Sequence, residues 1–266
     1  MIAYYENKSE EFRGWIGKKL SCCAHLHQHL ELVFFLEGRS VAYADTERFE
    51  LAPGDVFLAF PKQIHRYESS SPEKYMILVI DPEMIPEFSE LFAKSQPTCA
   101  VLHGAAEDPE LRDLMRRLVD MNRPTDVYET AIRRGYLLTL FGKLLPKFEY
   151  VGLQTGASHA FHTVVDYCTQ NYTKDLSLSF LEQELHISKY YISHMFSEKL
   201  QIGFNDYINS LRVSYACRHL RGGKLSVTEI GSLVGFSTPR TFNRAFLRQM
   251  GMTPSEYRKQ SRKGKA

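Results

Sequence analysis

The amino-acid sequence predicts an α+β multidomain protein, with an N-terminal β-barrel and a helical segment followed by an all-α C-terminal region. Three observations predict this fold class. Short apolar runs separated by turn residues fill the first third of the chain, and apolar residues at helical spacing follow them. The last third contains a helical unit that occurs twice. With 266 residues, the chain is long enough for two domains of ordinary size.

The first region is predicted to form short β-strands. The segments Ser40–Ala44, Val56–Phe60 and Lys74–Ile80 are rich in β-branched, aromatic or other apolar residues. Turn residues separate them, for example Pro53-Gly54-Asp55. Many short strands with this spacing are typical of a sandwich or a barrel, so we assign residues 1–106 to a β-barrel domain.

A helical segment follows the predicted strands. Apolar residues from Leu111 to Leu118 lie at the i, i+3, i+4, i+7 spacing of one helix face. Pro124 ends this helix, and a second helix is predicted over Val127–Leu145. The apolar stripes indicate that residues 107–150 either cover the barrel or form a dimerisation surface.

Charge is distributed unevenly along the chain. Residues 1–156 hold 18 Lys and Arg against 23 Asp and Glu, whereas residues 157–266 hold 15 against 8. An acidic part joined to a basic part indicates that the basic part meets a polyanion. Two glycines among polar residues mark a linker at 151–160 between these parts, and residues 161–266 form the predicted C-terminal domain.

The C-terminal domain contains an internal repeat. A shift of 50 residues superimposes the two copies, and the offset becomes 49 upstream of a turn where one residue is inserted. Each copy is predicted to form a helix, a tight turn and a second helix, which is a helix-turn-helix unit. The matched pairs are Leu181 and Ile230, Ile192 and Phe242, Phe196 and Phe246, and Tyr207 and Tyr257.

Capping residues mark the ends of the repeated helices. Between the two units a longer helix is predicted over roughly Asn205–Leu220. At ~1.5 Å per residue it is long enough to present two helices to successive major grooves, which lie about 34 Å apart. The expected caps are Ser177, Ser188, Thr238 before Pro239, a Ser226–Glu229 capping box, Gly235 at a helix end, and Thr253 to Glu256.

The second helix of each unit has one apolar and one polar face. A helix that enters the major groove needs such a polar face, with side chains that hydrogen-bond base edges or phosphates near its N-terminus. Two copies with the same turn and the same core positions favour DNA binding over an ordinary helical hairpin. The polar faces are Tyr190, Ser193, His194 and Ser197 in the first copy, and Arg240, Asn243 and Arg244 in the second.

These residues resemble the AraC/XylS family of bacterial transcription regulators, over about Leu176–Arg258. The strongest match is Ile230-Gly231-Ser232-Leu233-Val234-Gly235-Phe236-Ser237, followed by Phe242-Asn243-Arg244-Ala245-Phe246 and Gly251-Met252-Thr253-Pro254-Ser255-Glu256-Tyr257-Arg258. The resemblance implies that Lys189 and Arg244 can serve phosphates instead of bases. It implies base contacts from Tyr190, Ser193 and His194 in the first unit and from Arg240, Asn243 and Arg244 in the second.

The first unit departs from the family pattern at two positions. Glu182 stands where the family usually has alanine, at the crossing of the two helices, and Gln201 replaces the usual glycine after the second helix.

Arginine pairs with guanine and asparagine with adenine, so Arg240 and Asn243 are stronger readers of bases than Ser193. We therefore expect the second unit to dominate sequence discrimination.

The N-terminal region resembles a cupin barrel over about residues 25–80. The resemblance rests on His25-x-His27-x-x-x-Glu31, on the Gly38 and Pro53-Gly54-Asp55 that follow, and on His65. Alternation along a strand places His25, His27 and Glu31 on one face. Three interpretations stay open: a polar pocket for a small effector, a metal site for Fe, Mn, Ni or Zn, or a structural barrel mouth.

Together these observations predict a sequence-specific transcription regulator that binds double-stranded DNA and a small-molecule effector, a sugar or related metabolite as is common in the family. We assign effector binding to His25, His27, Glu31 and His65, and no catalytic residue, metal or cofactor. A homodimer is expected, with RNA polymerase as a further partner if the protein activates transcription. The alternatives are a DNA binder that needs no effector and a metal-dependent cupin enzyme fused to a DNA-binding domain.

The expected location is the cytoplasm, without a membrane partner. No apolar run approaches the ~20 residues that cross a membrane, and the N-terminus lacks the pattern of a secretion signal. The five cysteines show no C-x-x-C spacing, which suits a reducing compartment.

Overall fold

A computed structural model describes residues 4–5, 10–69, 72–153, 157–222 and 225–263. The chain forms two compact units. The N-terminal unit is Glu10–Gly156, and the C-terminal unit is Ala157–Ala266 together with Met1–Ser9, which includes strand β1 (Tyr4–Tyr5). Among the helices of the described residues, none is both long and apolar enough to span a membrane.

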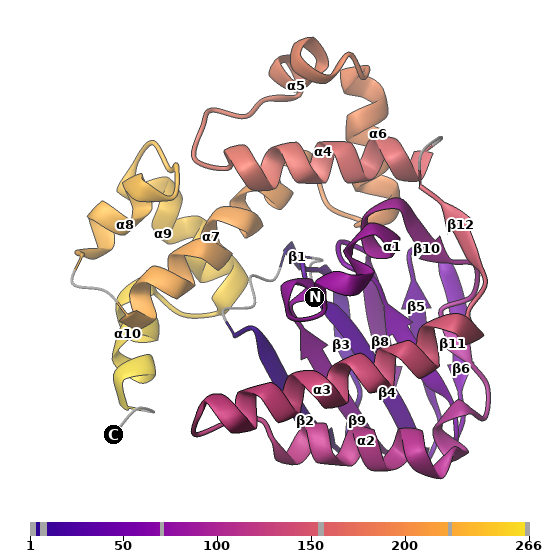
Figure 1. The fold of residues 1–266 in the computed structure, drawn as a ribbon. Coiled ribbons are helices and arrows are strands. Elements are labelled where there is room, and N and C mark those ends of the chain that lie inside the picture. The colour runs from indigo at the N-terminus through magenta and orange to yellow at the C-terminus, as the bar shows by residue number, and fades with distance from the viewer. Residues whose placement is uncertain (1–3, 6–9, 70–71, 154–156, 223–224, 264–266) are drawn as a thin grey trace. The chain divides into compact units, whose positions relative to one another are not determined.

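The N-terminal unit is built on two facing β-sheets, which confirms the predicted β-rich fold (Figure 1). One sheet runs in the order β3-β8-β5-β6 and the other in the order β11-β7-β4-β9-β2, while β10 and β12 form a separate pair. The strands are β2 (Phe12–Gly17), β3 (Cys22–Leu26), β4 (Leu30–Glu37), β5 (Ser40–Ala44), β6 (Glu47–Leu51), β7 (Val56–Ala59), β8 (His65–Ser69), β9 (Lys74–Ile80), β10 (Ser95–Pro97), β11 (Val101–Leu102) and β12 (Tyr150–Gly152).

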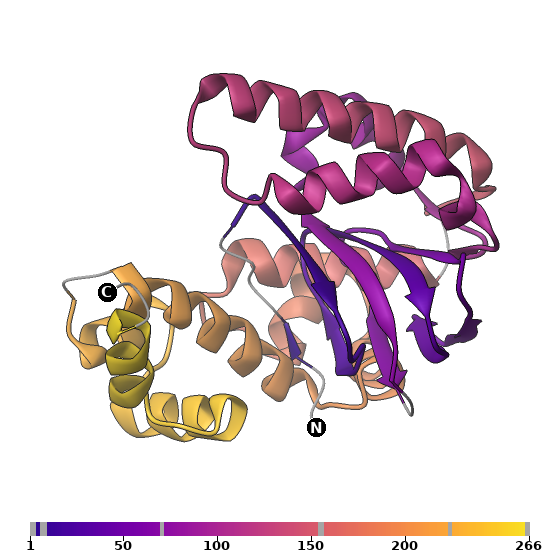
Figure 2. The same cartoon turned by 90° about the horizontal axis from the view of Figure 1, so that it is seen from below.

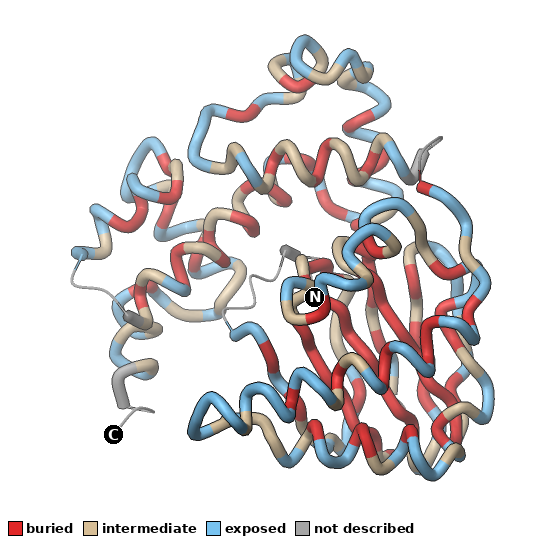
Figure 3. Tube along the Cα trace, in the orientation of Figure 1, coloured by how far each residue is buried: buried red, intermediate tan, exposed pale blue. Residues whose placement is uncertain are grey.

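The central strands of the sheet β11-β7-β4-β9-β2 are buried on both faces. Val33 and Phe35 of β4 pack toward the other sheet, with Tyr67 of β8, whereas Leu32 and Phe34 pack toward helices. This explains why β4, β7 and β9 are continuous apolar runs, while β5 alternates between buried and half-buried residues. Figure 3 shows these runs as unbroken buried segments.

Two helices cover the outer face of this same sheet. Helix α2 (Pro109–Asp120) contacts β2 and β9, and α3 (Val127–Leu144) packs beside α2 (Figure 2). The inner faces of both helices therefore pack on the barrel, and α3 ends one residue earlier than expected. The remaining short helices are α1 (Ser89–Lys94) and the 3₁₀ turns η1 (Pro82–Met84), η2 (Pro86–Phe88), η3 (Ala105–Glu107) and η4 (Leu145–Lys147).

The expected linker at 151–160 contains regular structure at both ends. Strand β12 includes its first residues and helix α4 its last, and residues 154–156 lie outside the described residues. In the C-terminal unit the helices are α4 (Ala157–Asn171), α5 (Leu178–Leu185), α6 (Lys189–Lys199), α7 (Phe204–Gly222), α8 (Val227–Leu233), α9 (Pro239–Met250) and α10 (Pro254–Lys263).

The repeat in the C-terminal unit forms two helix-turn-helix units, α5–α6 and α8–α9, as predicted. Helix α7 joins them and contacts α6, α8, α9 and α10. The structure confirms the side-chain caps at Ser177 and Thr238, the Ser226–Glu229 capping box, and reciprocal hydrogen bonds between Thr253 and Glu256.

The same two backbone positions are left-handed in both units. In the turn, His186 has φ 56° and its counterpart Gly235 has φ 92°. After the second helix, Gln201 has φ 56° and Gly251 has φ 68°. Left-handed backbone is strained for residues with a Cβ atom, so the first unit holds two residues in a conformation for which the second uses glycine.

Gln201→Gly should therefore stabilise the C-terminal unit by about 1 kcal/mol, because glycine adopts this conformation without a steric penalty. Urea unfolding of the full chain, followed by helical circular dichroism, measures the change.

Gly251→Ala is the matched control and should destabilise the unit by a similar amount. An added Cβ there would meet nothing within 4 Å, so only backbone conformation changes. A Gln201→Gly variant that is less stable than the natural chain would contradict this explanation.

Candidate nucleic-acid interface and ligand site

The second helix of the first unit, α6, exposes the residues that the sequence assigns to DNA. Tyr190 is 76% exposed, and Ser193 and His194 lie on the same solvent side of the helix. Ile192 and Phe196 are fully buried on the opposite side. The helical period thus separates a core face from a polar face, as predicted.

The second helix of the second unit, α9, has the same division. Arg240, Asn243 and Arg244 are exposed, whereas Phe242 and Phe246 are fully buried. The capping hydroxyl of Thr238 fixes the start of α9 directly before this set. The structure therefore places two arginines and an asparagine near the N-terminus of an exposed helix, where major-groove contacts are made.

Helix α7 contacts the second helix of each helix-turn-helix unit. The ring of Phe196 from α6 lies 4.8 Å from that of Tyr207 on α7, and Arg248 of α9 forms an ion pair with Asp206 of α7. Arg212 of α7 also donates hydrogen bonds to two carbonyl groups after α4. These contacts fix both second helices on one common helix.

The start of α6 differs from the sequence prediction. Ser188 makes no capping hydrogen bond with its side chain. Instead, Glu182 of α5 accepts a hydrogen bond from the backbone N–H of Lys189 at 3.0 Å, and its other oxygen lies 3.9 Å from Lys189 Nζ. The negative charge of the Glu182 carboxylate is stabilised by the positive, N-terminal end of the α6 dipole. The glutamate in place of the family's alanine is therefore a cap from the neighbouring helix, which the sequence analysis missed.

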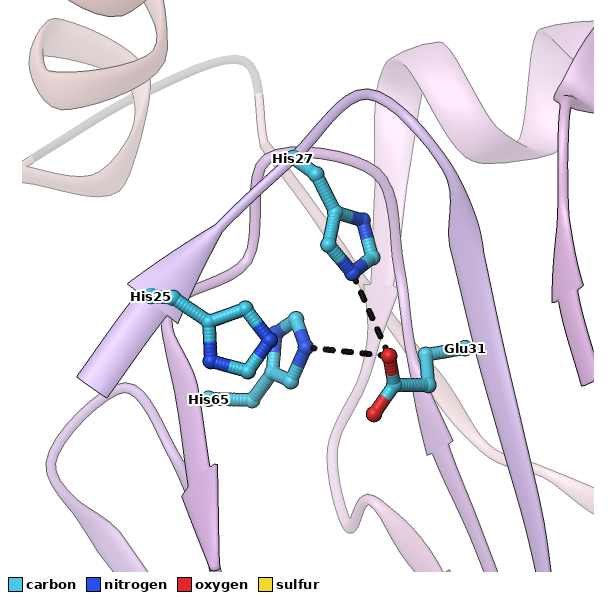
Figure 4. Close-up of side chains that lie close together, drawn as sticks. All are labelled: His25, His27, Glu31 and His65. Carbon is cyan, nitrogen blue, oxygen red and sulfur yellow. Dashed lines mark hydrogen bonds and ion pairs between the residues drawn. The ribbon is translucent and has the colours of Figure 1, made fainter. Parts of the chain in front are cut away.

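A second cluster of polar residues lies in the N-terminal unit, between its two sheets. His25 of β3 and His65 of β8 are register partners, Glu31 lies on β4, and His27 follows β3. All four residues are at most 3% exposed. Their candidate ligand atoms lie within 4.8 Å of one another, and Figure 4 shows the side chains converging. The structure thus brings together all four residues that the sequence singled out.

Hydrogen bonds to the backbone fix the three imidazole rings. The Nδ1 atoms of His25, His27 and His65 lie 3.0, 3.0 and 2.9 Å from the carbonyl oxygens of Cys23, His29 and Gln63. A carbonyl oxygen only accepts, so each Nδ1 carries a proton. In its neutral form each ring therefore has its lone pair on Nε2.

The carboxylate of Glu31 is held from two sides. Tyr67 donates a hydrogen bond to Oε1 at 2.8 Å, and Nε2 of His27 lies 3.3 Å from Oε2. Burial opposes ionisation of Glu31, but the charges and hydrogen bonds of His65 and His27 outweigh it and hold its pKa well below the usual range. Burial and the charge of Glu31 raise the pKa of Tyr67, which keeps it a donor. Tyr67 is a member of this polar cluster that the motif did not reveal.

Cys22 lies at the edge of this cluster. Its Sγ is 3.7 Å from Nδ1 of His25. A hydrogen bond with Cys23 and burial raise the pKa of the Cys22 thiol to about 12, so it is a neutral thiol rather than a thiolate ligand.

Comparisons with known proteins agree with this division into two units. Residues 181–260 match the model of a helix-turn-helix domain, and residues 15–141 match that of an AraC-like ligand-binding domain. The Msm operon regulatory protein of Streptococcus mutans is 25% identical over 236 residues, covering 85% of this chain and 83% of that protein. The transcriptional activator RhaR of Yersinia pseudotuberculosis is 23% identical over 259 residues, covering 88% and 83%.

Among solved structures, ToxT from Vibrio cholerae with a bound unsaturated fatty acid has a similar fold. The TM-score is 0.55 at 14% identity, over 93% of this chain and 94% of ToxT. The fold and the two domains define a DNA-binding transcription regulator with a ligand-binding domain. The chain belongs to the AraC family of these regulators.

Glu182 places a negative charge at the N-terminal end of α6, the helix that the sequence assigns to DNA. Glu182→Gln keeps an oxygen for the Lys189 N–H but removes the repulsion of phosphates. We expect DNA binding about threefold tighter, equivalent to ~0.7 kcal/mol, and a steeper dependence on salt. Fluorescence anisotropy with a labelled duplex at several salt concentrations measures both.

Glu184→Gln on the same helix is the control, because Glu184 accepts a hydrogen bond from Tyr167 of α4 instead of capping α6. Equal affinities of the Glu182→Gln variant and the natural chain would show that α6 does not approach phosphates by this end.

Proposed function

We propose that this protein is a sequence-specific transcription regulator that inserts α6 and α9 into the major groove and responds to a small-molecule effector. The observation that carries the proposal is the exposure of polar side chains on the second helix of both units, opposite their buried phenylalanines. Base contacts come from Tyr190, Ser193, His194, Arg240 and Asn243. Lys189 and Arg244 serve phosphates, and the protein works in the cytoplasm, where bacterial DNA lies.

The two units contribute differently to recognition. Arg240 and Asn243 carry the side chains that pair with guanine and with adenine through two hydrogen bonds. In the first unit His194 lies 3.3 Å from Glu198, which competes for its ring nitrogen. The second unit therefore supplies most of the sequence discrimination, and the first adds affinity.

The N-terminal unit supplies the effector site, with His25, His27, Glu31 and His65 as its polar groups. A sugar or a related metabolite is the proposed class of effector, as in the family. The relative RhaR is named a transcriptional activator, and in the same way we assign activation, with RNA polymerase as a partner, to this protein. The relatives are regulators by name, and we assign no enzymatic activity.

A homodimer through α3 presents two DNA-binding units. Tyr128 and Ile132 are 75% and 48% exposed. Gly135, Thr139 and Gly142 continue the same stripe at alternating spacings of three and four residues, which is the seam of paired helices. A Cβ atom at either glycine would meet nothing within 4 Å in this chain, so the missing side chains leave room for a second helix.

Selection of binding sites from random double-stranded DNA tests the proposed function. A single consensus with two half-sites one helical turn apart is expected. Binding without a consensus, with strong salt dependence only, would identify an effector-independent, non-specific DNA binder instead.

Arg240→Ala and Asn243→Ala should each lower the ratio of specific to non-specific affinity about 5- to 150-fold, because a bidentate base contact contributes ~1–3 kcal/mol. Anisotropy on the selected site and on a mismatched site gives the ratio. Lys189→Ala is the control and should weaken both sites equally. An unchanged ratio in both second-unit variants would contradict the assignment of α9 as the main reader.

Ile132→Glu should convert the dimer into a monomer, because it places a charge in the proposed seam. Sedimentation velocity of the full chain measures the mass. Thr130→Glu, on another side of α3, should leave the dimer intact. A natural chain that sediments as a monomer, with and without its DNA site, would rule out this surface.

A further inference from the structure

Helix α4 packs against the first helix-turn-helix unit. The ring centroid of Phe161 on α4 lies 5.7 Å from that of Phe196 on α6. Tyr167, also on α4, donates a hydrogen bond to Glu184 of α5 at 3.1 Å. The position of α4 is therefore tied to both helices of the first unit.

The residues that follow α4 lie against the turn of the second unit. Gly235, in the turn between α8 and α9, faces their backbone closely. A Cβ atom at Gly235 would lie 2.8 Å from the Cα atom and the carbonyl oxygen of Thr173, and 2.9 Å from the carbonyl oxygen of Tyr172. Side chains do not tolerate contacts this short, so glycine is what lets the two backbone segments touch.

Arg212 of α7 joins these two segments. Its Nε donates a hydrogen bond to the carbonyl oxygen of Tyr172 at 2.8 Å, and its Nη2 donates to that of Lys174 at 2.7 Å. The guanidinium carbon lies 5.7 Å from the ring centroid of Phe236, the residue after Gly235, which is within the range of a cation–π contact. A rigid guanidinium fork can make both carbonyl contacts at once, whereas the single ammonium group of lysine on its flexible stem cannot reproduce them.

The contact continues from the turn to α9. The ring centroid of Phe236 lies 5.2 Å from that of Phe242, which is fully buried under α9. Phe242 directly precedes Asn243 and follows Arg240 by two residues, so the seating of its ring determines where those two polar side chains leave the helix. A displacement of residues 172–174 against the turn would therefore move α9 relative to α6.

From these contacts we propose that Arg212 is a positioning residue for DNA recognition, which sets the spacing between α6 and α9 by tying the residues after α4 to the second unit. Two helices reach successive turns of the major groove only when their separation matches the DNA repeat. A looser tie would let α9 accept other spacings. The inference rests on the proposed function and deepens it, because it names the contacts that determine which half-site spacing the protein accepts.

The test measures how the full-length chain discriminates between half-site spacings. The probes are the duplex obtained by site selection and two duplexes in which the parts read by α6 and α9 are one base pair closer or farther apart. Fluorescence anisotropy gives the ratio of the affinities for the selected and the altered spacings. Arg212→Lys keeps the charge and should lower this ratio about 10-fold, the equivalent of one charge-assisted hydrogen bond. Partial unfolding alone would lower the affinity for all three duplexes by the same factor.

Two matched controls separate positioning from stability. Arg221→Lys, on the same helix, should leave the ratio unchanged, because Arg221 donates to the carbonyl oxygen of Cys217 within α7. Gly235→Ala and Gly251→Ala both place alanine at a left-handed backbone position. Only the Cβ atom at Gly235 meets the residues after α4, whereas the one at Gly251 meets nothing within 4 Å. Gly235→Ala should therefore lower the ratio as Arg212→Lys does, and Gly251→Ala should not.

An unchanged spacing ratio in Arg212→Lys, or an equal fall in Gly235→Ala and Gly251→Ala, would overturn the inference. If Arg212→Lys does not fold, as judged by circular dichroism, the pair of glycine variants decides. A consensus site with unchanged ratios would refute the inference alone and leave the proposed function standing. Failure to select any consensus from random DNA would refute both.

Discussion

The packing of α6 and α9 against the single helix α7 is the interaction on which the C-terminal unit depends. Phe196 enters the core of the first unit beside Tyr207, while Phe242 and Phe246 enter the second core with residues from the other half of α7. Once these rings are buried, the helical period places the polar residues of α6 and α9 on the opposite side of each helix. The polar face of each helix must point to solvent, and it does so from a common support.

A comparable constraint acts on β4 in the N-terminal unit. This strand is buried on both faces around Glu31, whose side chain is almost entirely shielded from bulk solvent. Its neighbours compensate the charge: Tyr67 donates to one oxygen, and two histidines approach the other. A glutamate would be costly in such a place without these partners, which ties the polar cluster to the architecture of the barrel.

Much of this could be predicted from the sequence, because period and capping are local properties. The strand at Lys74–Ile80 and the caps at Ser226 and Thr238 follow from residues close to one another in the chain. The histidine motif likewise indicated which side chains converge. The contacts that escaped prediction join distant segments or replace an expected local one: Tyr67 reaches Glu31 across the barrel, and Glu182 replaces Ser188 as the cap of α6. A sequence motif identifies only the residues at its own fixed spacing, and neither Tyr67 nor Glu182 is part of such a motif.

The two copies of the repeat have diverged in a consistent direction. The second unit uses glycine at both left-handed positions and caps its helices from within. The first keeps Gln201 in a strained conformation and relies on α5 to cap α6. Stored backbone strain lowers the free energy of local opening, so we expect α6 to open more readily than α9. Because base readout needs fixed side chains and phosphate attraction does not, this asymmetry gives a structural reason for discrimination to lie with Arg240 and Asn243.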